Sequence, residues 1–295
     1  MDLLDKLSSV AISQDSRITE KDRLMCEAHQ QAYDEAKKDI ESLYSLWMKM
    51  KEKQEELLFE AIDSVYSRDR YINIDGIKDY EITRKLECLP MLFITGVSSY
   101  FSHTYRVEID TDKIADMLLP KEPDRYDCNV KHNEEYRQKL REMTLKYQDI
   151  LEQIINQFDG RGFTEVAISQ IKQSAHNSSW DTYDGKPRYE VKNNTIKFTG
   201  YFCSASEYSG RFSVENKMKK VLTAAALFET GVVGQYPRSM TDSFSYSSRD
   251  CPDVYFYDCE KVVSMRMYKN GRVDLKFSTK ETASQFAENY LGSIC

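Results

Sequence analysis

The sequence predicts an α+β protein: a long helical arm of coiled-coil type, followed by a C-terminal body that contains an antiparallel sheet. Two observations predict this class. The stretch from about Thr19 to Ser67 has no Gly or Pro and is filled with residues that cost little free energy in a helix. Beyond residue 160 the chain is richer in Gly, Ser, Asn and aromatic residues and breaks into shorter elements. We therefore expect a mainly helical region over residues 1–160 and an α+β body over residues 161–295.

The expected arm carries apolar residues at the spacing of a supercoiled helix pair. Thr19 and Asp22 have the spacing of a capping box, which marks a helix start. The steps between the apolar positions alternate between four and three residues, as in a coiled-coil seam. Such an arm would be roughly 70 Å long, and its seam would need a partner helix. The predicted oligomerisation seam consists of Ala36, Ile40, Leu43, Trp47, Met50 and Leu57.

A second long helix is expected over residues 133–158. Its apolar residues again follow near-heptad steps, and Gly160 is placed to end it. This helix could return antiparallel along the arm of its own chain, or arms of different copies could pair, and the sequence leaves both open. Between the two helices, Leu89–Tyr105 is the most apolar stretch of the first half of the chain and predicts a buried helix.

Two shorter elements are expected after this buried helix. Apolar and polar residues alternate over residues 105–109, which predicts a short strand. Asp110 and Asp112 have the spacing of a metal-binding pair, but Asp112 is also a good helix cap. We expect the cap, at the start of a short helix that Pro120 ends.

In the body, a helix is expected from a cap at Ser213 to Thr230, with Gly231 closing it. Residues 193–194, Asn-Asn, predict a turn between two strands. The Ser-rich run over residues 239–249 predicts a loop.

The end of the body is expected to be a hairpin over residues 262–278 and a helix over residues 280–291. A three-residue loop with a left-handed Gly271 sorts apolar from polar residues, whereas a two-residue Asn-Gly turn mixes the two faces. Ser278 and Glu281 have capping-box spacing and should start the helix. The predicted cross-strand pairs are Val263 with Phe277, Met265 with Leu275, Met267 with Val273, Arg266 with Asp274, and Tyr268 with Arg272.

The composition argues against several classes of protein. A net charge of -7 disfavours broad contact with phosphates and leaves room only for a local basic patch, so direct nucleic-acid binding is not expected. Seven cysteines and four histidines, with no Cys-x-x-Cys pair, predict no metal site, and no cofactor motif is found. The chain shows neither a secretory signal nor a membrane span, so a soluble, cytosolic protein with no membrane partner is expected.

Asp253, Asp274 and Lys276 follow the order of catalytic residues in restriction-type nucleases. In such a site the acids hold Mg²⁺, while the lysine orients water or stabilises charge. The hairpin would place Asp274 and Lys276 on one face. However, acid-x-Lys is a common pattern, and Arg266 opposite Asp274 would compete with a metal ion. Salt bridging on a solvent-exposed face is the favoured interpretation, and no catalytic residue is predicted.

Aromatic residues are abundant, with 20 Tyr and 13 Phe, and many lie among basic residues in the C-terminal half. Tyr and Arg are favoured at the centres of protein interfaces, and they also suit stacking on single-stranded nucleic acid. Ordinary sheet composition explains them equally well. The candidate partner-contact residues are Tyr201, Tyr208, Arg211, Tyr268 and Arg272.

Two segments carry a resemblance to known proteins. They are residues 225–231, Ala-Ala-Leu-Phe-Glu-Thr-Gly, and residues 267–277, Met-Tyr-Lys-Asn-Gly-Arg-Val-Asp-Leu-Lys-Phe. Together they resemble the C-terminal part of an uncharacterised domain of phage and plasmid proteins, some of which are attached to DNA methyltransferases. In that domain a similar strand, Asn-Gly turn and strand precede a last helix. Residues 91–105 are loosely similar to it as well.

The overall plan also resembles that of phage-encoded Gabija anti-defence proteins, in chain length, long helical arm and α+β body. This resemblance implies stoichiometric inhibition without catalysis. Copies would assemble through arms and bodies into a cage around the bacterial Gabija nuclease–helicase complex, in the host cytoplasm, and block its access to DNA. The implied partners are that complex and further copies of the chain, and no cofactor is implied. The alternative is a nucleic-acid-associated binding module or a Mg²⁺-dependent nuclease.

Overall fold

The computed structural model has an α+β fold, as the sequence predicts. It describes residues 18–61, 79–123, 130–181, 183–206, 209–249 and 252–292. The chain divides into two compact units. The helical unit comprises the residues up to His103 together with Ile109–Gly160, and the body comprises Thr104–Glu108 and the residues from Arg161 onward.

Helix α2 (Glu20–Ala61) forms the arm. Its 42 residues span about 60 Å at the usual helical rise. The predicted capping box is confirmed. The Thr19 amide donates to Asp22 Oδ2 at 2.7 Å, and the Asp22 amide donates to Thr19 Oγ1 at 3.2 Å. Residues 62–67 of the expected arm lie outside the described residues.

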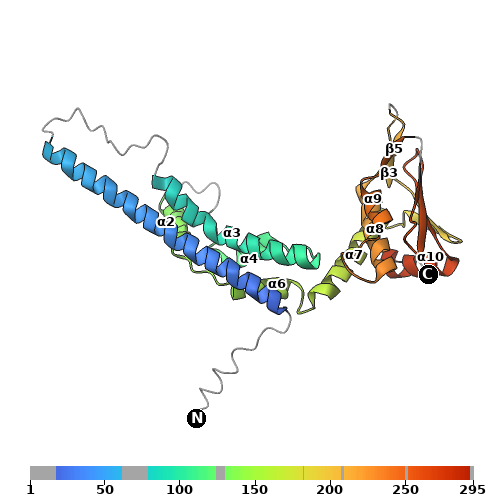
Figure 1. Cartoon of the computed structure of the whole chain (residues 1–295), viewed down its shortest axis with the longest axis horizontal. Coiled ribbons are helices and arrows are strands. Elements are labelled where there is room, and N and C mark those ends of the chain that lie inside the picture. Colours follow the sequence, from blue (N-terminus) through green and yellow to red (C-terminus); the bar gives the residue numbers. More distant parts are fainter. Residues whose placement is uncertain are drawn as a thin grey trace, which may run out of the picture. The chain divides into compact units, whose positions relative to one another are not determined.

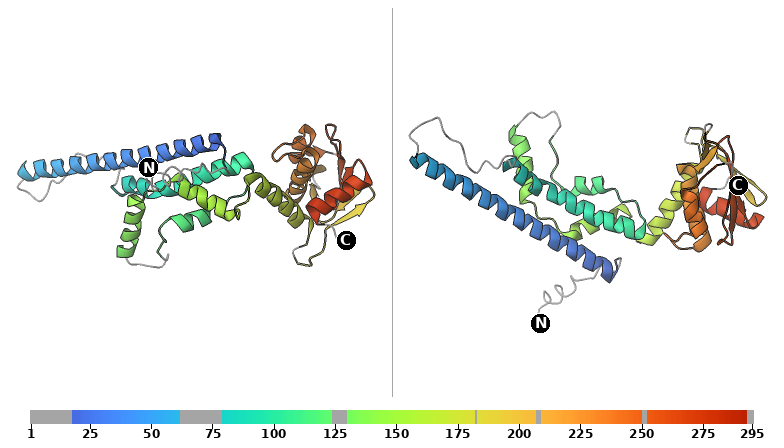
Figure 2. Two further views of the ribbon diagram at one scale, coloured as in Figure 1. Left: turned by 90° about the horizontal axis from the view of Figure 1, so that it is seen from below. Right: turned by 45° about the horizontal axis from the view of Figure 1, so that its top comes forward.

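Helix α3 (Asp79–Tyr105) lies beside α2, as Figures 1 and 2 show. It confirms the buried helix that the sequence predicts here and begins earlier than expected. The Tyr33 ring of α2 stacks on Phe93 of α3 with 4.7 Å between the ring centroids. The Tyr100 hydroxyl donates to Asp22 Oδ1 at 2.8 Å. Asp22 therefore both caps the arm and ties its first turn to α3.

The single helix expected over residues 133–158 is wrong. Two helices, α5 (Val130–Glu142) and α6 (Tyr147–Gln157), occupy this part of the chain, with residues 143–146 non-helical between them. Neither Gly nor Pro causes the break. Helix α6 packs on α2.

Side chains of the arm hold the break between α5 and α6. The Met143 carbonyl accepts hydrogen bonds from the Tyr33 hydroxyl at 3.2 Å and from Lys37 Nζ at 2.8 Å. The Leu145 carbonyl accepts one from Gln30 Nε2 at 3.1 Å, and the Leu145 side chain is buried. These bonds satisfy backbone carbonyls that a continuous helix would have used itself, so the interruption costs little.

The strand expected after α3 is also wrong, because two glutamine side chains bind its backbone. In the body, Gln170 accepts from the Glu108 amide at 2.7 Å and donates to the Glu108 carbonyl at 2.9 Å. In the helical unit, Gln157 bonds the amide and carbonyl of Asp110 in the same way, at 3.1 and 2.8 Å. Each side-chain amide takes the place that a neighbouring strand would fill.

Helix α4 (Thr111–Leu118) follows this segment and packs on α6. Its cap is Asp110, whose side chain accepts from the Lys113 amide at 3.1 Å, and not Asp112 as expected. Asp112 lies in the first turn instead, where its negative charge interacts favourably with the positive end of the helix dipole. Both acids of this pair thus stabilise the start of α4.

The body contains two antiparallel sheets. One has five strands in the order β1-β2-β8-β7-β6, and the other has three in the order β3-β4-β5. The strands are β1 (Tyr189–Lys192), β2 (Thr195–Phe198), β3 (Cys203–Ala205), β4 (Arg211–Val214), β5 (Ser247–Arg249), β6 (Asp253–Tyr255), β7 (Val262–Met267) and β8 (Val273–Phe277). The helices are α7 (Phe163–Ser179), α8 (Asn216–Thr230), α9 (Arg238–Phe244) and α10 (Lys280–Phe286), followed by a π-helical turn η1 (Ala287–Leu291).

Helices α8 and α10 pack against one face of the five-stranded sheet, here called the inner face (Figure 2). Alternate strand residues enter this core, and on β8 the residues between them, Asp274 and Lys276, point to the opposite, outward face. The Phe286 ring of α10 lies 5.2 Å from that of Phe277 on β8. The buried strand residues of the inner face are Ile196, Phe198, Val254, Val262, Met265, Met267, Val273, Leu275 and Phe277.

The predicted register of the β7–β8 hairpin is confirmed for Met265 with Leu275, Arg266 with Asp274, and Met267 with Val273. The Tyr268 amide donates to the Arg272 carbonyl at 2.9 Å, and Gly271 is left-handed with φ +80°. The pair at the open end is corrected. Phe277 pairs with Val262 and not with Val263, because one extra residue bulges out of β7. Val263 is the extra residue and is 37% exposed.

Two predicted helix caps in the body shift by one or two residues. Ser213 lies in β4, where pairing with β3 and β5 keeps the chain extended, and Glu215 is the residue before α8. Thr279, and not Ser278, caps α10. Its side-chain hydroxyl accepts a hydrogen bond from the Thr282 amide at 3.1 Å.

The loop expected over residues 239–249 is wrong, since it contains most of α9 and all of β5. The first turn of α9 takes its cap from a distant part of the chain. The Asp258 carboxylate accepts from the Arg238 amide at 2.6 Å and from the Ser239 amide at 3.4 Å. The sequence pattern of this Ser-rich run could not predict the helix, because its capping residue lies about twenty residues away.

Gly271→Ala should lower the free energy of unfolding of the body by about 2–5 kcal/mol. The left-handed backbone costs a side chain about 1–2 kcal/mol, and crowding adds about 1–3 kcal/mol, because a Cβ here would lie 3.0 Å from the Tyr201 amide nitrogen. Urea unfolding followed by Trp180 fluorescence, in a Trp47→Phe background, measures this. Gly185→Ala is the control, since Gly185 is left-handed with nothing within 4 Å. Equal losses in both variants would contradict the crowding.

Candidate functional site

The seam predicted along α2 lies on two sides of the helix. Ile40 and Trp47 are seven residues apart, and so are Tyr33 and Ile40, so these three share the side that packs on α3. The other members of the seam, Ala36, Leu43, Met50 and Leu57, are also spaced seven residues apart and form a second row along the helix. The exposed members are Leu43, Met50 and Leu57, at 52%, 39% and 58%, and the buried or half-buried members are Trp47, Ile40 and Ala36.

Leu46 belongs to the open side and was missing from the predicted seam. It is 57% exposed and lies three residues after Leu43 and four before Met50. This spacing alone could have revealed it, because residues three and four apart share a helix face. We call Leu43, Leu46, Met50 and Leu57 the arm stripe. It places four large apolar side chains in water along one line of the arm.

Three of the candidate partner-contact residues meet at the tip of the β7–β8 hairpin. The Arg272 guanidinium lies over the Tyr268 ring, 3.8 Å from its centroid. Tyr201, whose backbone touches the turn glycine, is 77% exposed and left-handed with φ +64°. Such a conformation costs about 1–3 kcal/mol in a residue other than Gly. Arg211 is exposed on β4, and Tyr208 lies outside the described residues.

The acids of the suggested nuclease site form ion pairs on the outward face of the sheet. Asp274 pairs with Arg272, with 3.0 Å between Oδ1 and Nε, and Asp253 pairs with Arg266 at 3.7 Å. Arg266 stands opposite Asp274, as predicted, but also opposite Asp253. Lys276 faces the same side two residues along β8. Across the described residues, no three His, Cys, Asp or Glu side chains gather closely enough to hold a metal ion.

The Phe-Glu-Thr-Gly sequence that closes α8 forms a structural latch. The Glu229 carboxylate accepts from three successive amides, those of Glu260, Lys261 and Val262, at 2.7, 2.9 and 3.0 Å. In return, Lys261 Nζ donates to the Phe228 carbonyl at 2.6 Å. The end of α8 is thereby fastened to the start of β7. The similar segment over residues 225–231 therefore has a structural role that requires no ligand.

His176 likewise has a structural partner. Its Nδ1 lies 2.8 Å from the Leu291 carbonyl, which also accepts from Trp180 Nε1 at 2.7 Å. The next carbonyl, of Gly292, accepts from the Tyr189 hydroxyl at 2.7 Å. These three side chains hold the end of the last helix against α7 and β1. The histidine is engaged in packing and is not placed as a general base.

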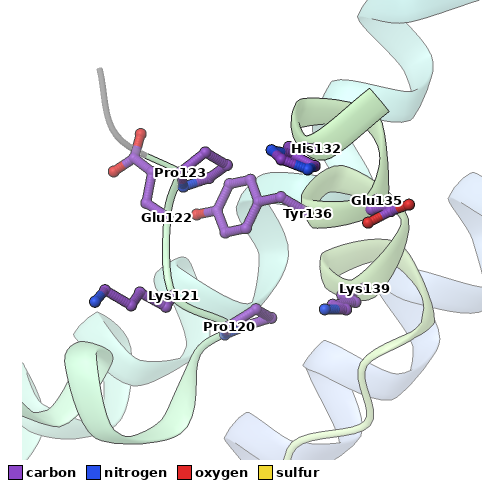
Figure 3. Close-up of a pocket in the computed structure, with 8 residues that line it drawn as sticks. All are labelled: Pro120, Lys121, Glu122, Pro123, His132, Glu135, Tyr136 and Lys139. Carbon is purple, nitrogen blue, oxygen red and sulfur yellow. The ribbon is translucent and has the colours of Figure 1, made fainter. Parts of the chain in front are cut away.

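A hollow of about 820 Å³ lies in the helical unit beside α5. Figure 3 shows the Tyr136 ring reaching from α5 toward the segment that carries the two prolines. Burial raises the pKa of Tyr136, and the charges of Glu122 and Glu87 add to this. The phenol is therefore protonated at neutral pH and cannot serve as a base. The lining residues are Pro120, Lys121, Glu122, Pro123, His132, Glu135, Tyr136 and Lys139.

The environments of Cys26 and Cys259 suppress thiol chemistry. Burial raises the pKa of Cys26 to about 12, with Asp22 and Glu27 adding to the effect. Burial also raises the pKa of Cys259 to about 12, with the charges of Glu229 and Asp258 as further causes. Because the thiolate is the reactive form, neither thiol is an effective nucleophile at neutral pH.

Comparison with protein-family models, with curated protein sequences and with solved structures gave no match. None of the helices in the described part of the chain combines the length and the apolar character needed to cross a membrane. The candidate functional surfaces are the arm stripe of the helical unit and the outward face of the sheet in the body.

Glu229→Gln should lower the free energy of unfolding of the body by about 1–3 kcal/mol, because the amide that replaces the carboxylate weakens charge-assisted bonds to three backbone amides. The midpoint of urea unfolding, followed through Trp180, measures the loss. Glu260→Gln removes the same charge from a neighbouring exposed residue and should leave the midpoint almost unchanged. A matching fall in both variants would show that charge alone, and not the latch, matters.

Alkylation at pH 8 should modify Cys88 at least about 100-fold faster than Cys26 and Cys259. Cys88 is exposed, whereas a thiol with a pKa of about 12 is almost wholly protonated at this pH. Iodoacetamide labelling followed by peptide mass mapping at successive times measures each rate separately. Cys259 is the informative case because it is only partly buried. Labelling of Cys259 as fast as Cys88 would contradict the effect of Glu229 and Asp258.

Proposed function

We propose that this protein is a phage-encoded, non-enzymatic inhibitor that associates with copies of itself through the arm and encases the bacterial Gabija nuclease–helicase complex. It would act in the cytoplasm of the infected cell by blocking the complex from binding and cutting DNA. The partner is suggested by the resemblance in overall plan. The single structural observation that supports the proposal is the arm stripe.

The arm stripe has the properties of an incomplete helix–helix interface. Its four side chains are 39–58% exposed and follow heptad spacing on a helix of 42 residues. Covering a leucine-sized side chain fully stabilises an interface by about 2 kcal/mol. Four half-exposed side chains from each of two copies therefore represent several kcal/mol of available association energy, before the entropy lost on association is subtracted.

The environments of the reactive residues support a role without catalysis. Asp274 is bound to Arg272 and Tyr268, and His176 is bound to the end of the last helix. Burial holds the thiol of Cys26 in its protonated form at neutral pH. Each of these groups has a structural interaction that accounts for its position. An inhibitor that works by enclosing its target needs reach and self-association, and the length of the arm and its exposed stripe support both.

Leu46→Glu should reduce the mass of the assembly, because a charge in the seam of a helix pair must be desolvated. We expect association to weaken by at least about tenfold, the equivalent of about 1.4 kcal/mol. Light scattering of the purified protein, alone and mixed with Gabija complex, measures the mass. A DNA-cleavage assay of the Gabija complex measures inhibition, which should be lost together with assembly.

Ser45→Glu is the matched control, since Ser45 is the exposed neighbour of Leu46 on another side of the helix. This variant should assemble and inhibit like the unmodified protein. A wild-type monomer that leaves the Gabija complex unaffected would refute the proposal, as would full inhibition by Leu46→Glu. Mg²⁺-dependent DNA cleavage by the protein alone would instead favour a nuclease.

A further inference from the structure

The outward face of the five-stranded sheet carries a row of alternating charges. In the register of the sheet, one residue from each strand lines up across all five strands, and successive side chains have opposite sign. Opposite charges directly across neighbouring strands attract, so the row is self-compensating. In strand order the residues are Glu190, Lys197, Asp274, Arg266 and Asp253.

Arginines neutralise the two aspartates of this row. Asp274 forms an ion pair with Arg272 and accepts from the Tyr268 hydroxyl at 3.0 Å, and Asp253 forms an ion pair with Arg266. Arg272 lies outside the row, on the side toward the hairpin turn, so it adds a positive charge to the same face. The two aspartates of the face are thus already bound, and Glu190, on the edge strand β1, lies opposite Lys197.

The neighbouring row on the same face contains no acid. In strand order it consists of Lys192, Thr195, Lys276, Ser264 and Tyr255. Lys192 and Lys276 flank Thr195 on β2, so their Cα atoms lie about 10 Å apart, which is two strand spacings. Tyr255 is 68% exposed at the far end of the row.

Three lysines on this face have no ion-pair partner among the described residues. They are Lys192, Lys197 and Lys276, from strands β1, β2 and β8. Lys197 lies two residues from Thr195 along β2, a distance of about 7 Å. Lys192 and Lys276 have no acid in their own row, and Lys197, which lies between Glu190 and Asp274 in the neighbouring row, completes a triangle of positive charge on a chain whose net charge is -7. We call them the lysine triangle.

We propose that this outward face binds single-stranded nucleic acid, with the lysine triangle on its phosphates and Tyr255 stacked on a base. Lysine is a point charge suited to phosphate, and the hydroxyls of Thr195 and Ser264 supply the donors that phosphate contacts commonly use. An exposed tyrosine beside a basic track is the usual arrangement for unpaired bases. An acidic protein partner fits less well, because lysine is depleted at the centres of protein interfaces.

The net charge argues against nucleic-acid binding only when it is averaged over the whole chain. The sheet separates charge on a local scale, which the composition cannot reveal. Because the rest of the molecule is acidic, the binding should be weak, confined to this face and strongly dependent on salt. This inference is independent of Gabija and can be tested on the protein alone.

Fluorescence anisotropy with labelled oligothymidylate at low salt tests the proposal. The triple variant Lys192→Gln, Lys197→Gln, Lys276→Gln should raise the dissociation constant at least about tenfold and reduce the slope of log K against log salt by about 2. Tyr255→Ala should weaken binding while leaving the salt slope almost unchanged, since it removes stacking and no charge.

The matched control replaces Lys217, Lys219 and Lys220 with Gln. These lysines lie on α8, which packs against the inner face, so the net charge falls equally while the outward face stays intact. This control should bind like the unmodified protein. Circular dichroism of each variant checks folding. Equal weakening by both triple variants would overturn the proposal, as would binding of labelled polyglutamate in preference to the oligonucleotide.

Discussion

The position of β8 between β2 and β7 is the constraint on which the body depends. Because side chains alternate along a strand, one register assigns Val273, Leu275 and Phe277 to the core and Asp274 and Lys276 to the outward face. A shift by one residue would exchange the two sets, burying the charges. The left-handed glycine at the hairpin turn sets this register from one end. The core and the charged face are therefore two consequences of one pairing.

A comparable constraint organises the helical unit. The heptad rhythm of α2 creates two adjacent rows of apolar positions, and α3 and the segment between α5 and α6 occupy only the side that holds Tyr33. Hydrogen bonds from the arm to the Met143 and Leu145 carbonyls fix which side this is. The remaining row becomes the arm stripe. A helix with this much exposed apolar surface is suited to association, as the proposed assembly requires.

The two surfaces differ in the chemistry they offer to a partner. The arm stripe is apolar and linear, which suits a second helix, whereas the outward sheet face is flat, basic and hydroxylated, which suits phosphate. Acidic residues of the body serve structural roles. Asp253 and Asp274 neutralise arginines of the outward face, and Glu229 latches α8 to β7. These roles are compatible with the proposed function in binding.

The sequence by itself determined the α+β class, the capping box of the arm, the buried helix α3 and most of the hairpin register. These features depend on residues close in sequence: a cap reaches three residues, and strand alternation repeats every two. Only the tertiary structure decided the break between α5 and α6, which rests on a bond between Tyr33 and Met143, 110 residues apart. It also decided which side of the arm stays exposed, because this depends on where α3 packs. The lysine triangle likewise needs the tertiary structure, because strands distant in sequence bring its side chains together.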